Sequence, residues 1–396
     1  MKRRTSLGMR RRKSAVVVGA GAFGGWTALH LLRQGVWVML VDAWGPGNSR
    51  ASSGGETRIL RATYGPDRVY VEMARRSLDL WRAHEEKWSR RLYHQISVLW
   101  MAPQDDHYER AALPVLRETG VDVEELTAKE AAARYPQINF EGVKWAILER
   151  DAGYLSAREA CRAVLEGFLV EGGEYRQLLA RPGAIRGGEM QEVVLSDGSS
   201  LVADAYVFAC GPWLGQLFPQ AVGDRIVPTR QEVFFFGAPA GDDRFSEGRL
   251  PVWIDHGQPM MYGIPNARGF KLADDTRGDC FDPTGGDRVV RTESIAAARK
   301  YLAFRFPALK DAPLIESRVC QYENSPDHDF IIDRHPQAGN VWIAGGGSGH
   351  AFKHGPAVGE RVADLVLERA KVDPLFGLAR FSPGFSGAAA PHLNHV

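Results

Sequence analysis

The first residues that could do chemistry are three glycines near the start of the chain. Gly19, Gly21 and Gly24 form a G-x-G-x-x-G pattern in "SAVVVGAGAFGGWTALHLLRQGVWVMLVDAW", between a β-branched strand and a helix. In such a unit the glycines allow a tight turn, close approach of a pyrophosphate and close helix–strand packing. Asp42 ends the next strand, where an acid binds ribose hydroxyls. This motif predicts that the protein binds a dinucleotide, but it does not distinguish NAD from FAD.

A single thiol, Cys320, is the second reactive feature, in "ESRVCQYENSPDHDFIID". The other cysteines are Cys161, Cys210 and Cys280, and no C-x-x-C or cysteine–histidine metal spacing occurs. The four do not form a disulfide framework, which favours a reducing cytoplasm, and no metal site is expected. A thiolate is a nucleophile, so Cys320 is a candidate for covalent chemistry.

Composition and charge indicate a globular enzyme with a basic first segment. A chain of 396 residues, 44% hydrophobic and 24% charged, is long enough for two domains. Residues 1–13 carry seven Lys or Arg and no acid, whereas the whole chain has a net charge of +1. This segment suits a nucleic-acid or membrane contact, a signal n-region or a disordered tail. We interpret it as a tail, because the apolar stretch after it is better used as strand, turn and helix and no A-x-A site follows.

Elements typical of a dinucleotide-binding fold recur at the start, middle and end of the chain. Helices are expected over 68–90, 157–171 and 292–307, with two short helices in 106–120, interrupted by Pro114, and in 127–136. A hairpin is expected around Asp197-Gly198, followed by a buried strand into "ACGPW". Strand-rich segments lie between, and "NVWIAGGGSGHAF" runs from a strand into a second glycine-rich loop. This order predicts two interleaved domains.

Six separated motifs then resemble the FAD-dependent amine oxidases of the monomeric sarcosine oxidase and N-methyltryptophan oxidase type. They are "GAGAFGG", "SSGGETRILRATYG", "ACGPW", "GFKL", "VCQYENSPDHDFIID" and "GGGSGHAFK", and the similarity spans residues 14–392. The resemblance implies FAD and not NAD. It also implies that Cys320 carries the flavin as a thioether, with Tyr322 completing the C-x-Y motif. Gly346, Gly347 and Gly349 would let the backbone approach the flavin ring.

The resemblance carries further roles to single residues. Arg58 is similar to the arginine against the flavin. Arg61 and Lys353 are similar to the pair that grips the substrate carboxylate, which is sound chemistry for an amino-acid anion. Lys271 is similar to the lysine that helps oxygen react, and Tyr262 to a substrate-pocket tyrosine, although its spacing to Lys271 is shorter than in sarcosine oxidase.

Two positions depart from the sarcosine oxidases. Ser53 and Gly54 stand where those enzymes have a histidine pair, and Asp275 stands where they have a histidine four residues after the lysine. Both changes argue against simple sarcosine oxidation. An acid at 275 would either pair with a cationic group of the substrate or face solvent.

The fold we predict is α/β, α+β in its second part: a Rossmann-type FAD-binding domain interleaved with a substrate domain on a mixed or antiparallel sheet. The FAD-binding domain would comprise 14–88, 152–224 and 322–392, and the substrate domain 89–151 and 225–321. The predicted function is oxidation of an amino-acid-type amine, with O2 reduced to hydrogen peroxide, by a cytoplasmic monomer. Catalytic roles fall to Lys271, Arg58, Tyr262 and Asp275, and substrate binding to Arg61, Lys353 and Tyr322.

Three alternatives remain open at this stage. A flavin dehydrogenase would pass electrons to a quinone or a protein. An NAD-dependent dehydrogenase is disfavoured by Cys320 in its motif. A nucleic-acid-binding protein using the basic tail is disfavoured because no recognition motif accompanies the charge. We expect neither a nucleic-acid nor a membrane partner.

Overall fold

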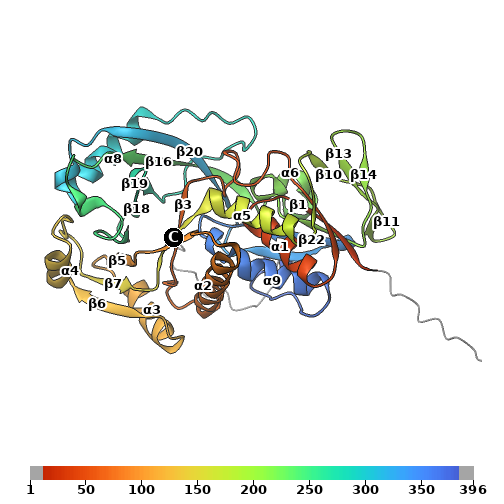
Figure 1. Cartoon of the computed structure of the whole chain (residues 1–396), viewed down its shortest axis with the longest axis horizontal. Coiled ribbons are helices and arrows are strands. Elements are labelled where there is room, and N and C mark those ends of the chain that lie inside the picture. Colours follow the sequence, from red (N-terminus) through yellow and green to blue (C-terminus); the bar gives the residue numbers. More distant parts are fainter. Residues whose placement is uncertain (1–11, 383–396) are drawn as a thin grey trace, which may run out of the picture.

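A computed structural model of the chain describes residues 12–382, so residues 1–11 of the basic tail and the segment 383–396 lie outside it. Two large sheets lie at opposite ends of the molecule, with long helices between and around them (Figure 1). None of the helices in the described range combines the length and apolar character needed to cross a membrane. No group of three metal-ligating side chains gathers within residues 12–382.

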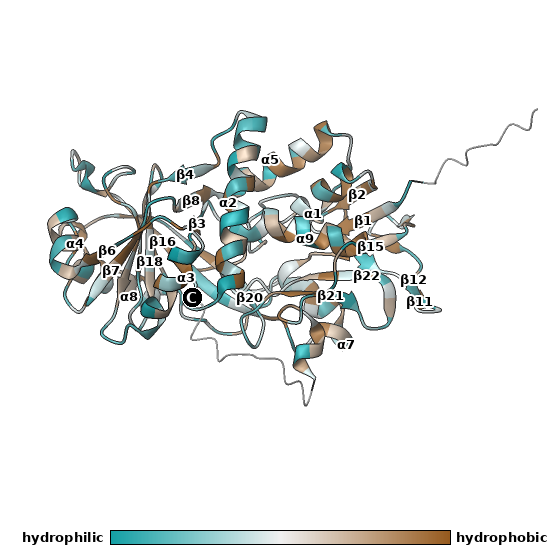
Figure 2. Cartoon of the chain, turned by 90° about the horizontal axis from the view of Figure 1, so that it is seen from below, coloured by the Kyte–Doolittle hydropathy of each residue, from teal (hydrophilic) through white to brown (hydrophobic). Residues whose placement is uncertain are grey.

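The first sheet has six strands in the order β21-β22-β15-β1-β2-β9. The pairs β9–β2, β2–β1, β1–β15 and β15–β22 are parallel, and β21 pairs antiparallel with β22. Its strands are β1 (Ser14–Val18), β2 (Trp37–Val41), β9 (Glu174–Arg176), β15 (Ala205–Phe208), β21 (Ile331–His335) and β22 (Ala338–Gly345). Figure 2 colours β1 and β2 largely brown, because apolar side chains lie on both faces of this sheet. The predicted Rossmann-type α/β sheet is confirmed.

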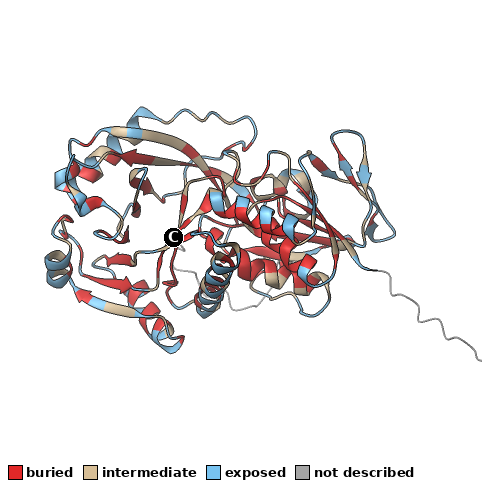
Figure 3. Cartoon of the chain, viewed as in Figure 1, coloured by how far each residue is buried: buried red, intermediate tan, exposed pale blue. Residues whose placement is uncertain are grey.

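Helix α1 (Ala22–Arg33) follows the glycine turn as the sequence predicts. Gly19 has φ +105°, a conformation that only glycine adopts readily. A Cβ on Gly24 would overlap the carbonyl oxygen of Gly19, so strand and helix meet too closely for any side chain there. Helix α9 (Gly355–Val366) packs against α1, and a Cβ on Gly359 would lie 2.6 Å from the backbone carbon of Trp26. Figure 3 shows α1 almost wholly buried.

The second sheet has eight strands in the order β20-β16-β19-β18-β17-β5-β7-β6. It is mostly antiparallel, with one parallel pair between β17 and β5. Helix α8 (Thr292–Arg305) covers one face, where Leu302 and Phe306 join a core with Trp253 and Phe270. The strands are β5 (Val98–Ala102), β6 (Val123–Thr127), β7 (Trp145–Glu149), β16 (Val227–Phe236), β17 (Val252–Asp255), β18 (Met261–Asn266), β19 (Gly269–Asp274) and β20 (Leu314–Asn324).

A three-stranded sheet of β3 (Thr57–Leu60), β8 (Gly153–Ser156) and β4 (Tyr93–Gln95) lies between the large sheets. Helices α2 (Arg68–Trp88) and α5 (Ala157–Val170) follow it, and α3 (His107–Glu118) stays helical through Pro114. That proline removes one backbone hydrogen bond without ending the helix, so the interruption predicted there is wrong. The remaining elements are α4 (Ala128–Arg134), α6 (Leu214–Leu217), α7 (Pro219–Val222), β10 (Ala180–Pro182), β11 (Ile185–Arg186), β12 (Glu189–Met190), β13 (Val193–Leu195), β14 (Ser200–Leu201) and the short 3-10 turns η1 (Gly211–Trp213), η2 (Asp243–Phe245), η3 (Pro307–Leu309), η4 (Phe352–His354) and η5 (Leu378–Phe381).

Candidate functional site

A cavity of about 710 Å³ lies at the carboxyl ends of β1, β2, β15 and β22. Ligands of parallel α/β sheets bind at this edge, outside the carboxyl ends of the strands. Among its lining residues are Gly19, Gly21, Asp42, Trp44, Trp213, Glu323, Gly347 and Gly349. The volume suits a dinucleotide, which is an elongated molecule larger than most substrates.

The glycines of both loops keep this cavity open. A Cβ on Gly347 would lie 2.7 Å from the Glu323 carboxylate, and one on Gly349, where φ is +85°, would lie 2.8 Å from the Tyr322 ring. Gly21 is the N-cap of α1, so the positive end of that helix faces the cavity. Glycine loops without side chains, next to a helix N-terminus, form a site that fits a pyrophosphate bound by backbone groups. Gly24 and Gly346 stand outside the lining and shape the two turns.

Asp42 lies at the end of β2, where the motif predicts the ribose-binding acid. Its Oδ2 accepts a hydrogen bond from the Ala20 amide at 2.8 Å, and its Oδ1 accepts from the Trp44 and Gly45 amides at 2.8 and 2.7 Å. Burial raises the pKa of this carboxyl, against the lowering effect of the three amides. Asp42 therefore holds the turn in place as well as lining the cavity.

A second, smaller cavity of about 70 Å³ adjoins the first. Arg58, Tyr322, Gly349 and Phe352 line both, so they form the wall between the two spaces. The smaller cavity brings together most of the predicted site residues, which are Arg58, Arg61, Tyr262, Lys271, Asp275, Cys320, Tyr322 and Lys353. These come from β3 and its flank, β18, β19, β20 and η4, which are far apart in the sequence.

Arg61 and Lys353 both line this cavity and both lie beside the ring of Tyr64. The Arg61 guanidinium carbon lies 4.6 Å from the centre of the Tyr64 ring and 4.9 Å from that of Trp100. Lys353 Nζ lies 4.9 Å from the centre of the same Tyr64 ring. Both side chains are buried, with 4% and 3% of their residue surface exposed. Two buried nitrogen donors beside an open space suit a small anion.

Lys271 lies on β19, and its amine contacts the first residue of β3. Its Nζ donates to the Thr57 carbonyl at 3.2 Å and to the Thr57 hydroxyl at 3.3 Å. Burial, followed by the neighbouring Arg58 guanidinium, lowers the pKa of Lys271 to about 7. The amine therefore changes its charge near neutral pH, which is unusual for a lysine and typical of functional sites.

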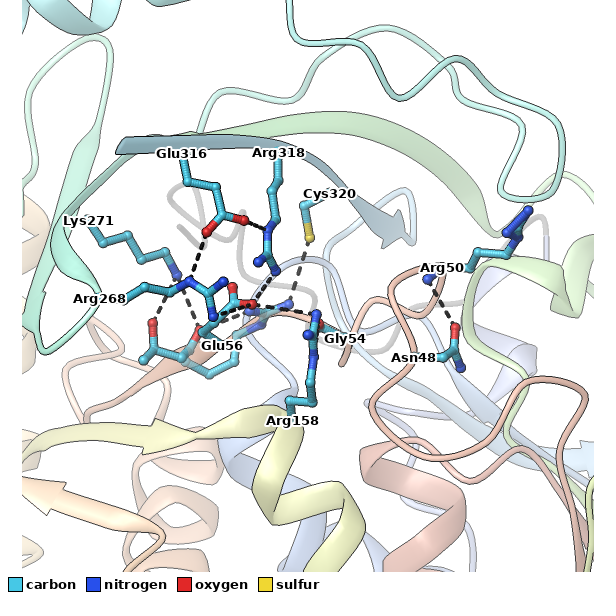
Figure 4. Close-up of polar contacts among 12 residues, drawn as sticks. Asn48, Arg50, Gly54, Glu56, Arg158, Arg268, Lys271, Glu316, Arg318 and Cys320 are labelled. Atoms are coloured by element: carbon cyan, nitrogen blue, oxygen red, sulfur yellow. Dashed lines mark hydrogen bonds and ion pairs between the residues drawn. The ribbon is translucent and has the colours of Figure 1, made fainter. Parts of the chain in front are cut away.

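Cys320 lies on β20 beside the Arg58 guanidinium. Arg58 Nη2 is 3.8 Å from Sγ, and Arg58 also donates to the carbonyls of Thr57, at 2.9 Å, and of Ser52 (Figure 4). No other cysteine pairs with this thiol in the described range. The thiol itself lines the smaller cavity.

A cluster of charged side chains closes the space around Lys271 and Cys320 (Figure 4). Glu56 pairs with Arg318, with Arg158 at 3.5 Å and with Arg268 at 3.8 Å, and Glu316 bridges Arg268 and Arg318. Because Glu56 directly precedes Thr57, these ion pairs hold the start of β3 against β20. They fix the backbone that Lys271 and Arg58 contact.

Asp275 faces the small cavity and not the solvent. Its Oδ1 accepts from the Tyr322 hydroxyl at 2.6 Å, and its Oδ2 accepts from Arg277 at 2.9 Å. Burial raises its pKa, while Arg277 and Tyr322 act in the opposite direction. Both oxygens therefore already have donors, and Asp275 orients Tyr322 and Arg277 more directly than it offers a charge to a substrate cation.

Ser53 lies at the edge of the large cavity, and Gly54 follows it in the chain. Ser53 lines that cavity, and a Cβ on Gly21 would meet its hydroxyl at 3.1 Å. The Gly54 carbonyl accepts from Arg158 at 2.7 Å. The two residues thus shape the loop between the first glycine turn and β3.

The sequence motifs did not single out Glu323 or Tyr64. Glu323 lines the large cavity, accepts from the Ser52 hydroxyl, and burial raises its pKa to about 7. Tyr64 lies in "RATYG" and donates or accepts at His354 Nε2 (2.8 Å) and His350 Nδ1 (3.2 Å). Only their positions in the sequence could have pointed to them: Glu323 directly follows Tyr322, and Tyr64 lies three residues after Arg61.

Comparison with known proteins identifies the class. The family model described as FAD dependent oxidoreductase matches residues 14–365, so the chain belongs to that family. It is 29% identical to monomeric sarcosine oxidase of Arthrobacter sp. (strain TE1826), over 91% of this chain and 94% of that protein. It is 28% identical to N-methyl-L-tryptophan oxidase of Salmonella heidelberg (strain SL476), over 93% and 98%.

Solved structures give the same fold. The L-proline dehydrogenase from P. horikoshii matches with a TM-score of 0.82 at 22% identity, covering 93% of this chain and 98% of that one. The resemblance to the sarcosine oxidase and N-methyltryptophan oxidase type is confirmed, and the protein is an FAD-dependent oxidoreductase.

Proposed function

We propose that the protein oxidises a small amino-acid-type amine and reduces O2 to hydrogen peroxide. The observation that carries this proposal is the convergence of Arg61 and Lys353 on a cavity of about 70 Å³ that shares a wall with the dinucleotide cavity. The relatives named as sarcosine and N-methyltryptophan oxidases support an amine substrate. The small volume favours an amine with a short side chain.

Each cavity has one task in this account. The glycine loops around Gly19, Gly21, Gly347 and Gly349 would hold FAD in the larger cavity, where it would supply the hydride acceptor and pass the electrons to O2. Arg61 and Lys353 hold the carboxylate, which fixes the position of that carbon. Arg58 and Tyr322, which line both spaces, separate substrate from cofactor, and Tyr262 closes the cavity from β18. The imine product hydrolyses in water.

The amine must lose a proton before the hydride leaves. An amine of pKa about 10 is only about 0.1% neutral at pH 7, which costs roughly 4 kcal/mol. The positive charge of Arg61 favours the neutral amine, and pairing with the carboxylate partly cancels this effect. A base in the site that takes this proton would reduce the cost.

The chain divides, in this proposal, into an FAD-binding part (14–88, 152–224 and 322–392) and a substrate part (89–151 and 225–321). All strands of the parallel sheet fall in the first set, and those of the eight-stranded sheet fall in the second, except that β20 crosses the boundary. Residues 383–392 lie outside the described range. We further infer a monomer, and a cytoplasmic location that the four free cysteines support.

Screening amines for peroxide release and oxygen uptake tests the proposed function. We expect turnover of N-methyl, cyclic or primary amino acids with short side chains, and equal amounts of oxygen consumed and peroxide formed. Reduction of an artificial dye by these amines without oxygen uptake would instead establish a dehydrogenase.

We also propose that Cys320 tethers FAD through a thioether. The position of Sγ beside Arg58 and next to the shared wall supports this attachment. The purified protein should keep its yellow colour in an acid-precipitated pellet, and a peptide containing Cys320 should carry the flavin mass. Cys320→Ser should release its flavin to the supernatant, whereas Cys280→Ser, at an exposed thiol, should not. Flavin in the supernatant of the unaltered protein would refute tethering.

The oxygen reaction should depend on pH through Lys271. The pKa of its amine is lowered to about 7 by burial, so the amine is charged below this pH and neutral above it. A positive charge stabilises the anion that forms as O2 takes an electron. The rate constant for reoxidation of the reduced enzyme should therefore fall about tenfold between pH 6 and pH 8. Stopped-flow mixing with oxygenated buffer measures it, and a rate that rises with pH would contradict the assignment.

A further inference from the structure

Lys353 lies in a setting that does not suit a permanent ammonium group. Its residue is 3% exposed, and its Nζ makes one hydrogen bond within the described chain, to the His350 carbonyl at 2.9 Å. None of the ion pairs found among residues 12–382 includes it. A buried ammonium normally requires a carboxylate partner and several acceptors.

The charged groups around Lys353 reinforce this point. Arg61, a permanent cation, shares the Tyr64 ring with it. Two acids face it, Glu149 on β7 and Asp275 directly after β19. Glu149 already accepts from the Ala62 and Thr63 amides, and Asp275 from Tyr322 and Arg277. His350 and His354, on its own turn, are bonded to the Tyr64 hydroxyl. Burial first, and Arg61 second, hold the pKa of Lys353 well below its usual range.

The substrate brings a proton that must go to some base. At pH 7 an amino acid is a zwitterion, and only about one molecule in a thousand has a neutral amine. Asp275 has donors on both oxygens. Tyr262 and Tyr322 are phenols whose pKa burial raises, so they stay protonated. Lys271 also becomes neutral above about pH 7, but its Nζ is bound to two oxygens of Thr57. Lys353, which has one acceptor and shares the Tyr64 ring with the carboxylate-binding Arg61, is the better-placed base.

We propose that Lys353 is uncharged in the substrate-free enzyme and takes the proton that the substrate's ammonium group loses on binding. One N–H bond breaks at the substrate, whose nitrogen keeps the electron pair, and one N–H bond forms from the lone pair of Nζ. The total charge of the complex does not change. The step leaves a neutral amine, ready for oxidation, and a lysine ammonium that pairs with the substrate carboxylate. This inference rests on the proposed carboxylate clamp.

Acetate tests the inference, because it has the carboxylate but no proton to give. If Lys353 is neutral before binding, acetate must draw about one proton from the buffer. Titration calorimetry of the flavin-containing enzyme at pH 8, in two buffers of different ionisation enthalpy, counts this proton. The dissociation constant of acetate, followed by the flavin absorbance, should rise about tenfold for each pH unit in the range where Lys353 is neutral.

Two variants separate Lys353 from the other lysine of the site. Lys353→Arg keeps a permanent charge for the carboxylate, so it should bind acetate without proton uptake and with little dependence on pH. Lys271→Met should still take up the proton. The visible flavin spectrum checks that both variants are folded.

The outcomes distinguish this inference from the function on which it rests. Uptake of about one proton that Lys353→Arg loses and Lys271→Met keeps supports it. Acetate binding without proton uptake, or uptake that persists in Lys353→Arg, would overturn it and leave the clamp intact. Failure of acetate to bind at all would contradict the clamp, and the inference with it.

Discussion

Lys271→Met should slow the reaction of the reduced enzyme with O2 by roughly 10²- to 10³-fold. Methionine keeps the length of the side chain but removes its charge. A unit charge about 4 Å from another contributes about 4 kcal/mol at the effective dielectric constant of a partly buried site, and each 1.4 kcal/mol is a factor of ten in rate. Anaerobic reduction by the amine substrate should change much less, because Lys271 contacts Thr57 and not the carboxylate-binding pair.

Two controls test whether the effect of Lys271→Met comes from the lost charge at this position. Lys310→Met removes a lysine whose side chain is 67% exposed and which lines neither cavity, and it should leave both half-reactions unchanged. In Lys271→Met the pH dependence of reoxidation near pH 7 should also disappear, since the titrating amine is gone. If substrate reduction slows while reoxidation is unaffected, Lys271 does not act on oxygen.

Arg61→Ala should weaken binding of the substrate roughly 10- to 150-fold. A hydrogen bond to a charged group contributes about 1.5–3 kcal/mol, and the guanidinium is the permanent cation of the pair that faces the small cavity. Flavin should stay bound, because Arg61 lines only the smaller space. Anaerobic titration gives the dissociation constant and the rate of reduction separately, which steady-state KM does not.

Arg68→Ala is the matched control for this substitution. Arg68 begins α2, its side chain is 46% exposed, and its partners are Glu72 and Glu118. Its loss should leave substrate binding unchanged. A substrate that binds Arg61→Ala as tightly as the unaltered enzyme would remove the carboxylate clamp from the account.

The sequence predicted the local parts of the fold well, because those parts depend on residues close together in the chain. The first βαβ unit is an example, since the turn at Gly19 and the packing at Gly24 follow from the absence of side chains there. Pro114 is a case where local reasoning failed. This proline removes one backbone hydrogen bond, but the helix continues through it. Local rules do not say when neighbouring contacts outweigh such a loss.

The family resemblance paired Arg61 with Lys353, but the contacts that hold such distant segments together could not be predicted from the sequence. Arg61 and Lys353 both contact the ring of Tyr64, although they lie almost 300 residues apart in the sequence. Asp275 likewise accepts hydrogen bonds from Tyr322 and Arg277 and is buried. The sequence alone did not exclude that this acid faces solvent. Residue type gave the chemistry of each group, but only the three-dimensional arrangement gave its partners.

The most direct test of the account compares an amino-acid substrate with its methyl ester. Both carry the same amine, and only the free acid has the carboxylate for Arg61 and Lys353. Mixed anaerobically with the enzyme, an N-methyl amino acid with a short side chain should bleach the flavin absorbance, and its ester should do so far more slowly at equal concentration. Equal bleaching by the two compounds, or bleaching by neither across short-chain amino acids, would contradict an amine oxidase that holds its substrate by the carboxylate.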